Sequence, residues 1–231
     1  MAGDQGVSYE LIKYPDREAM MIDLAMRLAD ELESVLHHQP EALLVVPGGT
    51  TPGPIFDTLS NIDLEWSRVS VMLSDERWVP EDSPRSNTRL LRERLLTGRA
   101  AAATLLPLHA PVSLPEAALA ELAEAIAPKL PISVLLLGMG ADMHTASLFP
   151  GADLLDEALA PDAPLLLPMR APGAPEPRIT LSANALDGAM SKHIVITGAE
   201  KLEALSRAKS LSKAEAPVTA IWGDAVIHWA E

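Results

Sequence analysis

The chain has 231 residues, a formal net charge of −14 and no cysteine. The acidic balance disfavours nucleic acid and anionic membranes as partners, because both select basic surfaces. The lack of cysteine excludes disulfides, thiol catalysis and cysteine-based metal sites. The N-terminus shows no signal-peptide pattern, and no apolar run approaches the roughly 20 residues of a membrane span. We therefore expect a soluble, cytoplasmic protein with one α/β domain over residues 1–231.

Apolar runs bounded by turn residues alternate with helix-like segments along the chain. The runs predict strands at residues 7–14, 42–46, 69–73, 132–137, 193–198 and 218–222, and similar segments at 163–169 and 178–182 bracket a proline-rich loop. Asp16 is the predicted N-cap of the first helix and Asn87 that of a middle helix, while Ser113 and Pro115 are predicted to open an alanine-rich helix that ends before Pro128. Continuous apolar strands between helices indicate a mostly parallel sheet that is covered on both faces.

Four polar motifs follow predicted strands of this sheet. They are "PGGTTPG" from Pro47, "SDERWVP" from Ser74, "GMGADMHTAS" from Gly138 and "TGAEK" from Thr197. Ligands of open α/β sheets bind beyond the carboxyl ends of the strands. The four motifs are therefore expected to converge on one binding site.

The first motif has the features of an anion cradle. Gly48 and Gly49 allow backbone conformations that other residues resist, Thr50 and Thr51 offer hydroxyl groups, and a helix start follows. An ordinary tight turn between a strand and a helix would have the same pair of glycines. The segment matches neither the Walker pattern nor GxGxxG, so a nucleotide is not indicated.

Cationic side chains occur in two of the motifs. Asp75 and Arg77 directly follow an apolar strand, in a charged block that also contains Asn87, and a guanidinium there can hold a phosphate through two hydrogen bonds. Lys201 lies near a helix start, where a lysine opposes the helix dipole unless an anion is present. Solvated surface charge remains the alternative for both.

The histidine motif is the most specific signal. Asp142 lies two residues before His144, and a carboxylate beside an imidazole fixes its tautomer and raises its basicity. The alternative is a structural histidine that closes a turn. The other histidines show no HExxH-type metal spacing, and Ser147 does not lie in a GxSxG elbow.

Together the motifs resemble the 6-phosphogluconolactonase family, which belongs to a larger group with glucosamine-6-phosphate deaminase/isomerase. "GMGADMHTASLFPG" is similar to the family signature G-x-G-x-D-G-H-T-A-S-L-F-P, and "SDERWVP", "PRITLSANALDGA" and "ITGAEKLEAL" are similar to three further family segments. The resemblance covers nearly the whole chain. It implies an open, Rossmann-like α/β fold and hydrolysis of 6-phospho-D-glucono-1,5-lactone to 6-phospho-D-gluconate, without metal or cofactor, in the pentose phosphate or the Entner-Doudoroff pathway.

The resemblance also implies roles for individual residues. His144 is the implied general base and Asp142 its neighbour. The implied substrate- and phosphate-binding residues are Gly48, Gly49, Thr50, Asp75, Arg77, Asn87, Arg178 and Lys201. The sequence gives neither the oxyanion hole nor the roles of Arg85 and Arg170.

Met143 stands where the family signature has glycine. A position that requires a positive φ would strain a methionine. Because unforced strain is uncommon, we predict an ordinary negative φ at Met143.

Two other functions remain open. A deaminase/isomerase would share the fold, the phosphate site and the D-x-H pair, but its histidine segment resembles H-I-A-F-N-E-P, and here Phe149 replaces the acidic residue. A non-catalytic sugar-phosphate sensor would bind without turnover, but such a protein usually lacks the D-x-H pair or carries a DNA-binding module.

Overall fold

In the computed structural model, which describes residues 9–231, the strands form two sheets. The larger sheet has seven strands, and all of its pairings are parallel. Its strands in spatial order are β1 (Glu10–Lys13), β10 (Val226–Ala230), β9 (Ser191–Thr197), β6 (Val134–Gly138), β2 (Ala42–Val46), β3 (Val69–Leu73) and β5 (Thr104–Leu105). The expected α/β architecture with a mostly parallel sheet is confirmed.

A second sheet of three antiparallel strands was not expected from the sequence. It consists of β4 (Asp75–Arg77), β8 (Arg178–Leu181) and β7 (Leu166–Met169), in that order. Only Ser74 separates β4 from the end of β3, so the chain passes directly from the large sheet into the small one. The small sheet therefore begins at the carboxyl edge of the large sheet.

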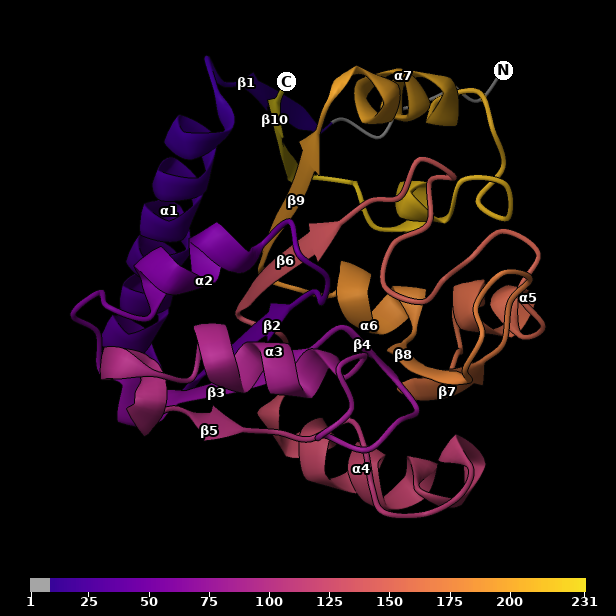
Figure 1. Cartoon of the computed structure of the whole chain (residues 1–231), viewed down its shortest axis with the longest axis horizontal. Helices are drawn as coiled ribbons and strands as arrows, with labels where there is room; N and C mark the ends of the chain where they lie inside the picture. Colours follow the sequence, from indigo (N-terminus) through magenta and orange to yellow (C-terminus); the bar gives the residue numbers. More distant parts are fainter. Residues whose placement is uncertain (1–8) are drawn as a thin grey trace.

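Helices surround the large sheet. They are α1 (Arg17–His38), α2 (Gly53–Leu59), α3 (Asn87–Arg94), α4 (Leu119–Ile126), α5 (Leu155–Leu159), α6 (Ala183–Asp187) and α7 (Ala199–Ala208). Figure 1 shows α1 and α2 together on one side of the central strands, with α6 and α7 on the other side. In the part of the chain that the structure describes, every helix is too short or too polar to span a bilayer.

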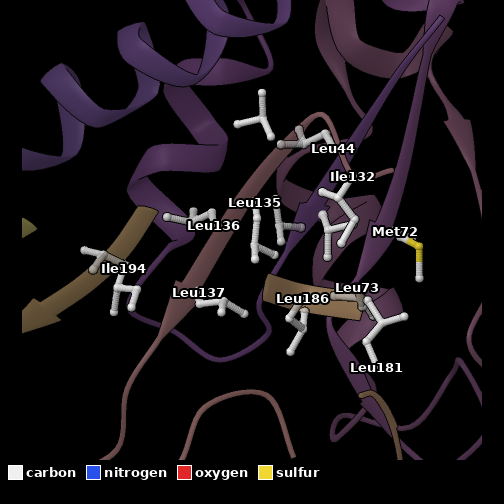
Figure 2. Close-up of a cluster of buried hydrophobic side chains, with 14 of the residues drawn as sticks. Leu44, Met72, Leu73, Ile132, Leu135, Leu136, Leu137, Leu181, Leu186 and Ile194 are labelled. Carbon is white, nitrogen blue, oxygen red and sulfur yellow. The ribbon is translucent and has the colours of Figure 1, made fainter. Parts of the chain in front are cut away.

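The core lies between these layers (Figure 2). Leu135, Leu136 and Leu137 of β6 are fully buried, as expected for a strand that is covered on both faces. Leu181 of β8 and Leu186 of α6 lie close to the side chains of the large sheet in Figure 2 and are also fully buried. The small sheet is therefore anchored in the same core as the large one.

The helix boundaries agree with the sequence only in part. Asp16 caps α1 as predicted, because its Oδ1 accepts a hydrogen bond from the amide of Ala19 at 2.8 Å. The predicted cap at Asn87 is wrong. Ser86 caps α3 and accepts from the amide of Arg89 at 3.2 Å, which leaves Asn87 as the first helical residue. The alanine-rich helix begins as a short 3-10 helix at Pro115–Ala117 and only then becomes α4.

The C-terminal strand prediction is also wrong. Residues 217–220 form a 3-10 helix (Pro217–Ala220), although "VTAIW" has a strand-like composition. The last strand is β10, which inserts between β1 and β9 and carries His228 into the sheet. At the other end, β1 begins at Glu10, and the first two residues of the predicted strand, Val7 and Ser8, lie outside the described residues.

Candidate active site

A pocket of about 230 Å³ opens at the carboxyl edge of the large sheet, where residues of all four polar motifs meet. From β2 the chain continues to β3 on one side, and it later returns as β6 on the other side of β2. Such a reversal is the usual ligand site of open α/β sheets. The pocket is lined by Pro47, Gly48, Gly49, Thr51, Pro52, Asp75, Arg77, Asn87, Gly138, Met139, Gly140, His144, Ala146, Arg178, Val195 and Lys201.

The glycine loop forms one wall of the pocket. Gly49 has a φ of 83°, and a Cβ on Gly48 would lie 2.1 Å from Cγ of Asn87, so both positions require glycine. Thr51 lines the pocket, whereas Thr50 lies in an adjacent groove. Helix α2 begins at Gly53 beside this wall, where Pro52 and Pro54 have no amide hydrogen and the Gly53 amide donates to the carbonyl of Thr50 at 3.2 Å.

His144 and Asp142 form a hydrogen-bonded pair. Nδ1 of His144 lies 2.5 Å from Oδ1 of Asp142, and the same oxygen accepts from the His144 amide at 3.1 Å. A Cβ on Gly140 would lie 2.2 Å from Nδ1, so the close approach of the ring requires glycine there. With Nδ1 as the donor to the carboxylate, Nε2 carries a free lone pair.

The electrostatics of the pair favour an ionised Asp142. Partial burial acts to raise the pKa of Asp142, but the hydrogen bond and the charge interaction with His144 outweigh it and hold the pKa below its ordinary value. Among residues 9–231 no hydrogen-bond partner is seen for Nε2 of His144, and the side chain lines the pocket with 31% of its surface exposed. The carboxylate therefore fixes the orientation of the imidazole and leaves Nε2 without a partner among the described residues.

The predicted negative φ at Met143 is wrong. Its φ is 66°, and Ala146, on the other side of His144, has a φ of 48°. The Met143 amide donates to the carbonyl of Gly140 at 2.9 Å, and its carbonyl accepts from the amide of Val218 at 3.1 Å. The side chain is also buried, at 9% exposure, in the core. Two hydrogen bonds and this burial hold the strained turn that presents His144.

Phe149 lies between the histidine and an arginine. Its ring centroid is 4.5 Å from that of His144, and the Cζ atom of Arg178 lies 5.6 Å above the same ring. The position at which the deaminase pattern has an acid is therefore filled here by an apolar ring. That ring restrains a face of the imidazole and the guanidinium together.

Arg77 and Arg178 form a cationic wall. They are directly opposite each other in the β4–β8 pair, an arrangement that is unfavourable for like charges. Both Nε atoms are buried, and neither finds a hydrogen-bond partner within the described residues. Burial lowers the pKa of Arg178, the charge of Arg77 acts in the same direction, and Asp75 opposes them. An anion in the pocket would relieve the repulsion between the two guanidinium groups.

Three further predicted residues, Lys201, Asn87 and Asp75, line the pocket, and Asp75 is already engaged in hydrogen bonds. The oxygens of Asp75 accept from the hydroxyls of Ser74 at 2.9 Å and Ser147 at 2.6 Å. Asp75 therefore ties β4 to the histidine loop.

Arg85 and Arg170 are engaged in ion pairs outside the pocket lining. Arg85 pairs with Glu176 at 2.7 Å, and Arg170 pairs with Glu116 at 2.7 Å. The carbonyl of Arg85 also accepts from Nη1 of Arg77 at 2.7 Å, which fixes part of the Arg77 side chain.

Comparisons with known proteins identify the family of this chain. The sequence model of the family described as glucosamine-6-phosphate isomerases/6-phosphogluconolactonase matches residues 15–229. The chain is 44% identical over 212 residues to a 6-phosphogluconolactonase from Pseudomonas aeruginosa, a match that covers 89% of this chain and 88% of the relative. It is 41% identical over 221 residues to one from Rhizobium meliloti, with 92% and 93% covered.

The chain belongs to the glucosamine-6-phosphate isomerase/6-phosphogluconolactonase family. The crystal structure of a 6-phosphogluconolactonase from Shewanella baltica matches with a TM-score of 0.93 and 33% identity, over 97% of this chain and 98% of that one. A monomeric glucosamine-6-phosphate deaminase matches with a TM-score of 0.78 at 15% identity, which shows the shared fold alone. The family resemblance predicted from the motifs is confirmed.

Some lining residues of this family member were not predicted from its sequence. Gly140 is the second glycine of the "GMG" motif, and its spacing from Asp142 and His144 could have identified it. Thr51 was named as a hydroxyl residue of the loop without being placed in the site. Val195 lies within β9 and carries no local signal that separates it from the core residues beside it.

Proposed function

We propose that this protein hydrolyses 6-phospho-D-glucono-1,5-lactone to 6-phospho-D-gluconate, with His144 as the general base. The enzyme class is supported by the relatives, which are 6-phosphogluconolactonases and match this chain along nearly their whole lengths. The observation that carries the mechanism is the 2.5 Å contact between His144 and Asp142 in a pocket that also contains two guanidinium groups with unpartnered Nε atoms.

The chemical steps need only these residues and water. Nε2 of His144 takes a proton from a water molecule whose oxygen attacks the lactone carbonyl carbon. Asp142 stabilises the imidazolium that forms. The tetrahedral oxyanion then collapses, the bond between C1 and the ring oxygen breaks, and the imidazolium returns its proton to that oxygen. One water is consumed and one free carboxylic acid is formed.

The proposed phosphate anchor consists of the basic side chains and the glycine loop that line the pocket. Arg77, Arg178 and Lys201 supply positive charge, and the Gly48–Gly49 loop supplies backbone donors next to the start of α2. Charge-assisted hydrogen bonds from buried guanidinium groups are among the strongest available for holding a phosphate. Anchoring the distant phosphate places the carbonyl carbon against the histidine.

Several finer points of the proposal remain predictions. The route uses no metal or cofactor. We further propose that the protein is one domain and acts in the cytoplasm, in the pentose phosphate pathway or in the Entner-Doudoroff pathway.

A lactone-hydrolysis assay tests the proposal. The lactone is generated from glucose 6-phosphate with a dehydrogenase, and its loss is followed above the spontaneous rate, while a second assay detects ammonia released from glucosamine 6-phosphate. We expect accelerated lactone hydrolysis and no ammonia. Ammonia release would favour the deaminase alternative, and tight lactone binding without turnover would favour a sensor.

A further inference from the structure

Glu76 is a buried acid that the proposed mechanism does not use. It lies in the middle of β4, between Asp75 and Arg77, and is 0% exposed. No ion pair of the described chain involves it. A carboxylate taken out of water without a cationic partner is unfavourable unless hydrogen bonds satisfy its oxygens.

Five hydrogen bonds satisfy Glu76. Its Oε1 accepts from the amides of Arg77 at 2.7 Å and Asn87 at 2.9 Å. Its Oε2 accepts from the amide and the hydroxyl of Thr88, both at 2.7 Å, and from the Ser86 hydroxyl at 3.4 Å. Every partner donates to these oxygens, and the start of α3 stabilises negative charge at this position.

These hydrogen bonds connect two walls of the pocket. One partner is the backbone of Arg77, whose guanidinium lines the pocket, and another is the first residue of α3, Asn87, whose side chain presses against Gly48. The histidine loop is held separately, through the contact of Asp75 with Ser147. Glu76 therefore holds Arg77 and Asn87 in place without contacting His144.

We propose that Glu76 is a positioning residue that sets the place of Arg77 and Asn87 for phosphate recognition. The inference rests on the proposed function. It predicts that weakening the hydrogen bonds of Glu76 impairs recognition of the phosphate group and leaves the chemistry at the lactone carbonyl intact.

The test compares Glu76→Gln with the wild type on two lactones. The glutamine has the same shape but replaces one acceptor oxygen with a donor, which faces amide hydrogens. We expect KM for the phosphorylated lactone to rise about tenfold, in line with the sensitivity of a bound substrate to small misplacements. We expect little change in kcat, and no change in kcat/KM for unphosphorylated gluconolactone. Glu93→Gln is the matched control on the exposed side of α3, where it removes only a surface ion pair with Arg89.

A milder variant covers the case in which Glu76→Gln does not fold. Thr88→Val removes one hydroxyl donor to Glu76 and keeps the backbone donors, so we expect a smaller rise in KM for the phosphorylated lactone alone. An equal loss with both lactones, or no loss in either foldable variant, would overturn the proposal.

A binding measurement separates this inference from the proposed function. Calorimetry with inorganic phosphate reports on the cationic wall whether or not the lactone is hydrolysed. We expect weaker phosphate binding in Glu76→Gln or Thr88→Val and unchanged binding in Glu93→Gln. Unchanged phosphate binding in both test variants would contradict the positioning role, while absent lactonase activity in the wild type would contradict the proposed function.

Discussion

Two regions of this protein pair a histidine with a carboxylate, and they are built differently. In the pocket, one ring nitrogen of His144 is hydrogen-bonded to Asp142, and 31% of the His144 side-chain surface is exposed. Beneath α1, His193 and His228 are 2% and 0% exposed. There, His193 contacts Glu31 at 2.9 Å and His228 at 2.9 Å.

In the buried network, every ring nitrogen of His193 and His228 has a hydrogen-bond partner. Tyr14 donates its hydroxyl hydrogen to Asp23 at 2.5 Å, so its oxygen accepts from Nδ1 of His228 at 2.9 Å. Nε2 of His228 then accepts from His193, whose other nitrogen faces Glu31. For each contact to be a hydrogen bond, one proton must lie between His193 and Glu31.

The difference supports the proposed role of His144 as the base. A neighbouring carboxylate is present in both regions, so it does not decide the matter. What separates them is a free ring nitrogen that faces a pocket, which His144 has and the two buried rings lack. We therefore propose that the first region serves catalysis and the second stability.

The largest effect is expected when each carboxylate is neutralised in turn. Asp142→Asn removes the negative charge that stabilises the imidazolium, and we expect kcat to fall by on the order of 10²-fold or more. Glu31→Gln is the matched change in the buried network and should lower the melting temperature while leaving kcat of the folded protein unchanged. Steady-state kinetics and thermal unfolding on both variants check this, and a similar fall in kcat in both would end the distinction.

The next effect compares an unpartnered cation with a paired one. Arg77→Ala removes a guanidinium whose Nε has no partner within residues 9–231, and we expect kcat/KM for the phosphorylated lactone to fall about 10- to 100-fold. Unphosphorylated gluconolactone should be affected little, so the preference for phosphate is lost; Lys201→Ala should act in the same direction. Arg170→Ala, which removes a surface ion pair, is the control. If both Arg77→Ala and Lys201→Ala kept the preference for the phosphorylated lactone, the phosphate would bind elsewhere.

The buried network should make stability depend on pH. Burial lowers the pKa of His228 to about 3, with His193 and Arg27 acting in the same direction against Asp23 and Glu31. In the unfolded chain the pKa is roughly 6.5, so below that pH the unfolded state takes up a proton that the folded state does not. Stability should fall by up to about 1.4 kcal/mol per pH unit between roughly pH 6.5 and 3.

Denaturant unfolding of His228→Gln at several pH values isolates this contribution. Glutamine keeps a polar partner but does not titrate, so its stability should fall less steeply below pH 6.5 than that of the wild type. The depressed pKa values of Asp23, Glu31 and Asp142 also remove stability at lower pH, in both proteins. Parallel curves for the two proteins would contradict the assignment to His228.

The smallest effect concerns backbone strain. Residues with a positive φ flank His144, whereas the residues of the buried network have none. Met143→Gly and Met143→Ala both lose a buried side chain, worth about 1.5–3 kcal/mol. Only glycine relieves the positive φ, so the glycine variant should be more stable than the alanine variant by up to about 1 kcal/mol. Ala146→Gly, with only a methyl group to lose, should raise the free energy of unfolding. Greater stability of Met143→Ala over Met143→Gly would show that the turn is relaxed.

Local patterns were sufficient to predict much of the fold. The strands at 42–46 and 69–73 and the cap at Asp16 depend on neighbouring residues, which the sequence displays directly. Strand β10 was missed although Val226, Ile227 and Trp229 are strand-forming residues, and its pairing with β1 and β9 is visible only in the folded chain. The segment at 218–222 is the opposite case, because its first residues belong to a 3-10 helix (Pro217–Ala220) in spite of their strand-like composition.

The candidate site was predicted better than its surroundings. Motifs at strand ends were enough to bring His144, Arg77 and Lys201 together, because parallel strands place their carboxyl ends at one edge. The hydrogen bonds of Glu76 to Ser86, Asn87 and Thr88 span 10 to 12 residues and the His193–His228 contact spans 35, and no sequence pattern signals either. The strain at Met143 was missed for the same reason, because a hydrogen bond from Val218 and burial in the core hold it.

One side-by-side measurement tests the central claim most directly: kcat for the phosphorylated lactone and the melting temperature, for His144→Ala and His228→Gln. We predict that His144→Ala lowers kcat by a factor on the order of 10²–10⁴ with little change in melting temperature. We predict that His228→Gln lowers the melting temperature and keeps the wild-type kcat in the folded protein. Near wild-type turnover in His144→Ala, or an equally large fall in kcat in His228→Gln, would contradict the division of the molecule into a catalytic and a stabilising histidine site.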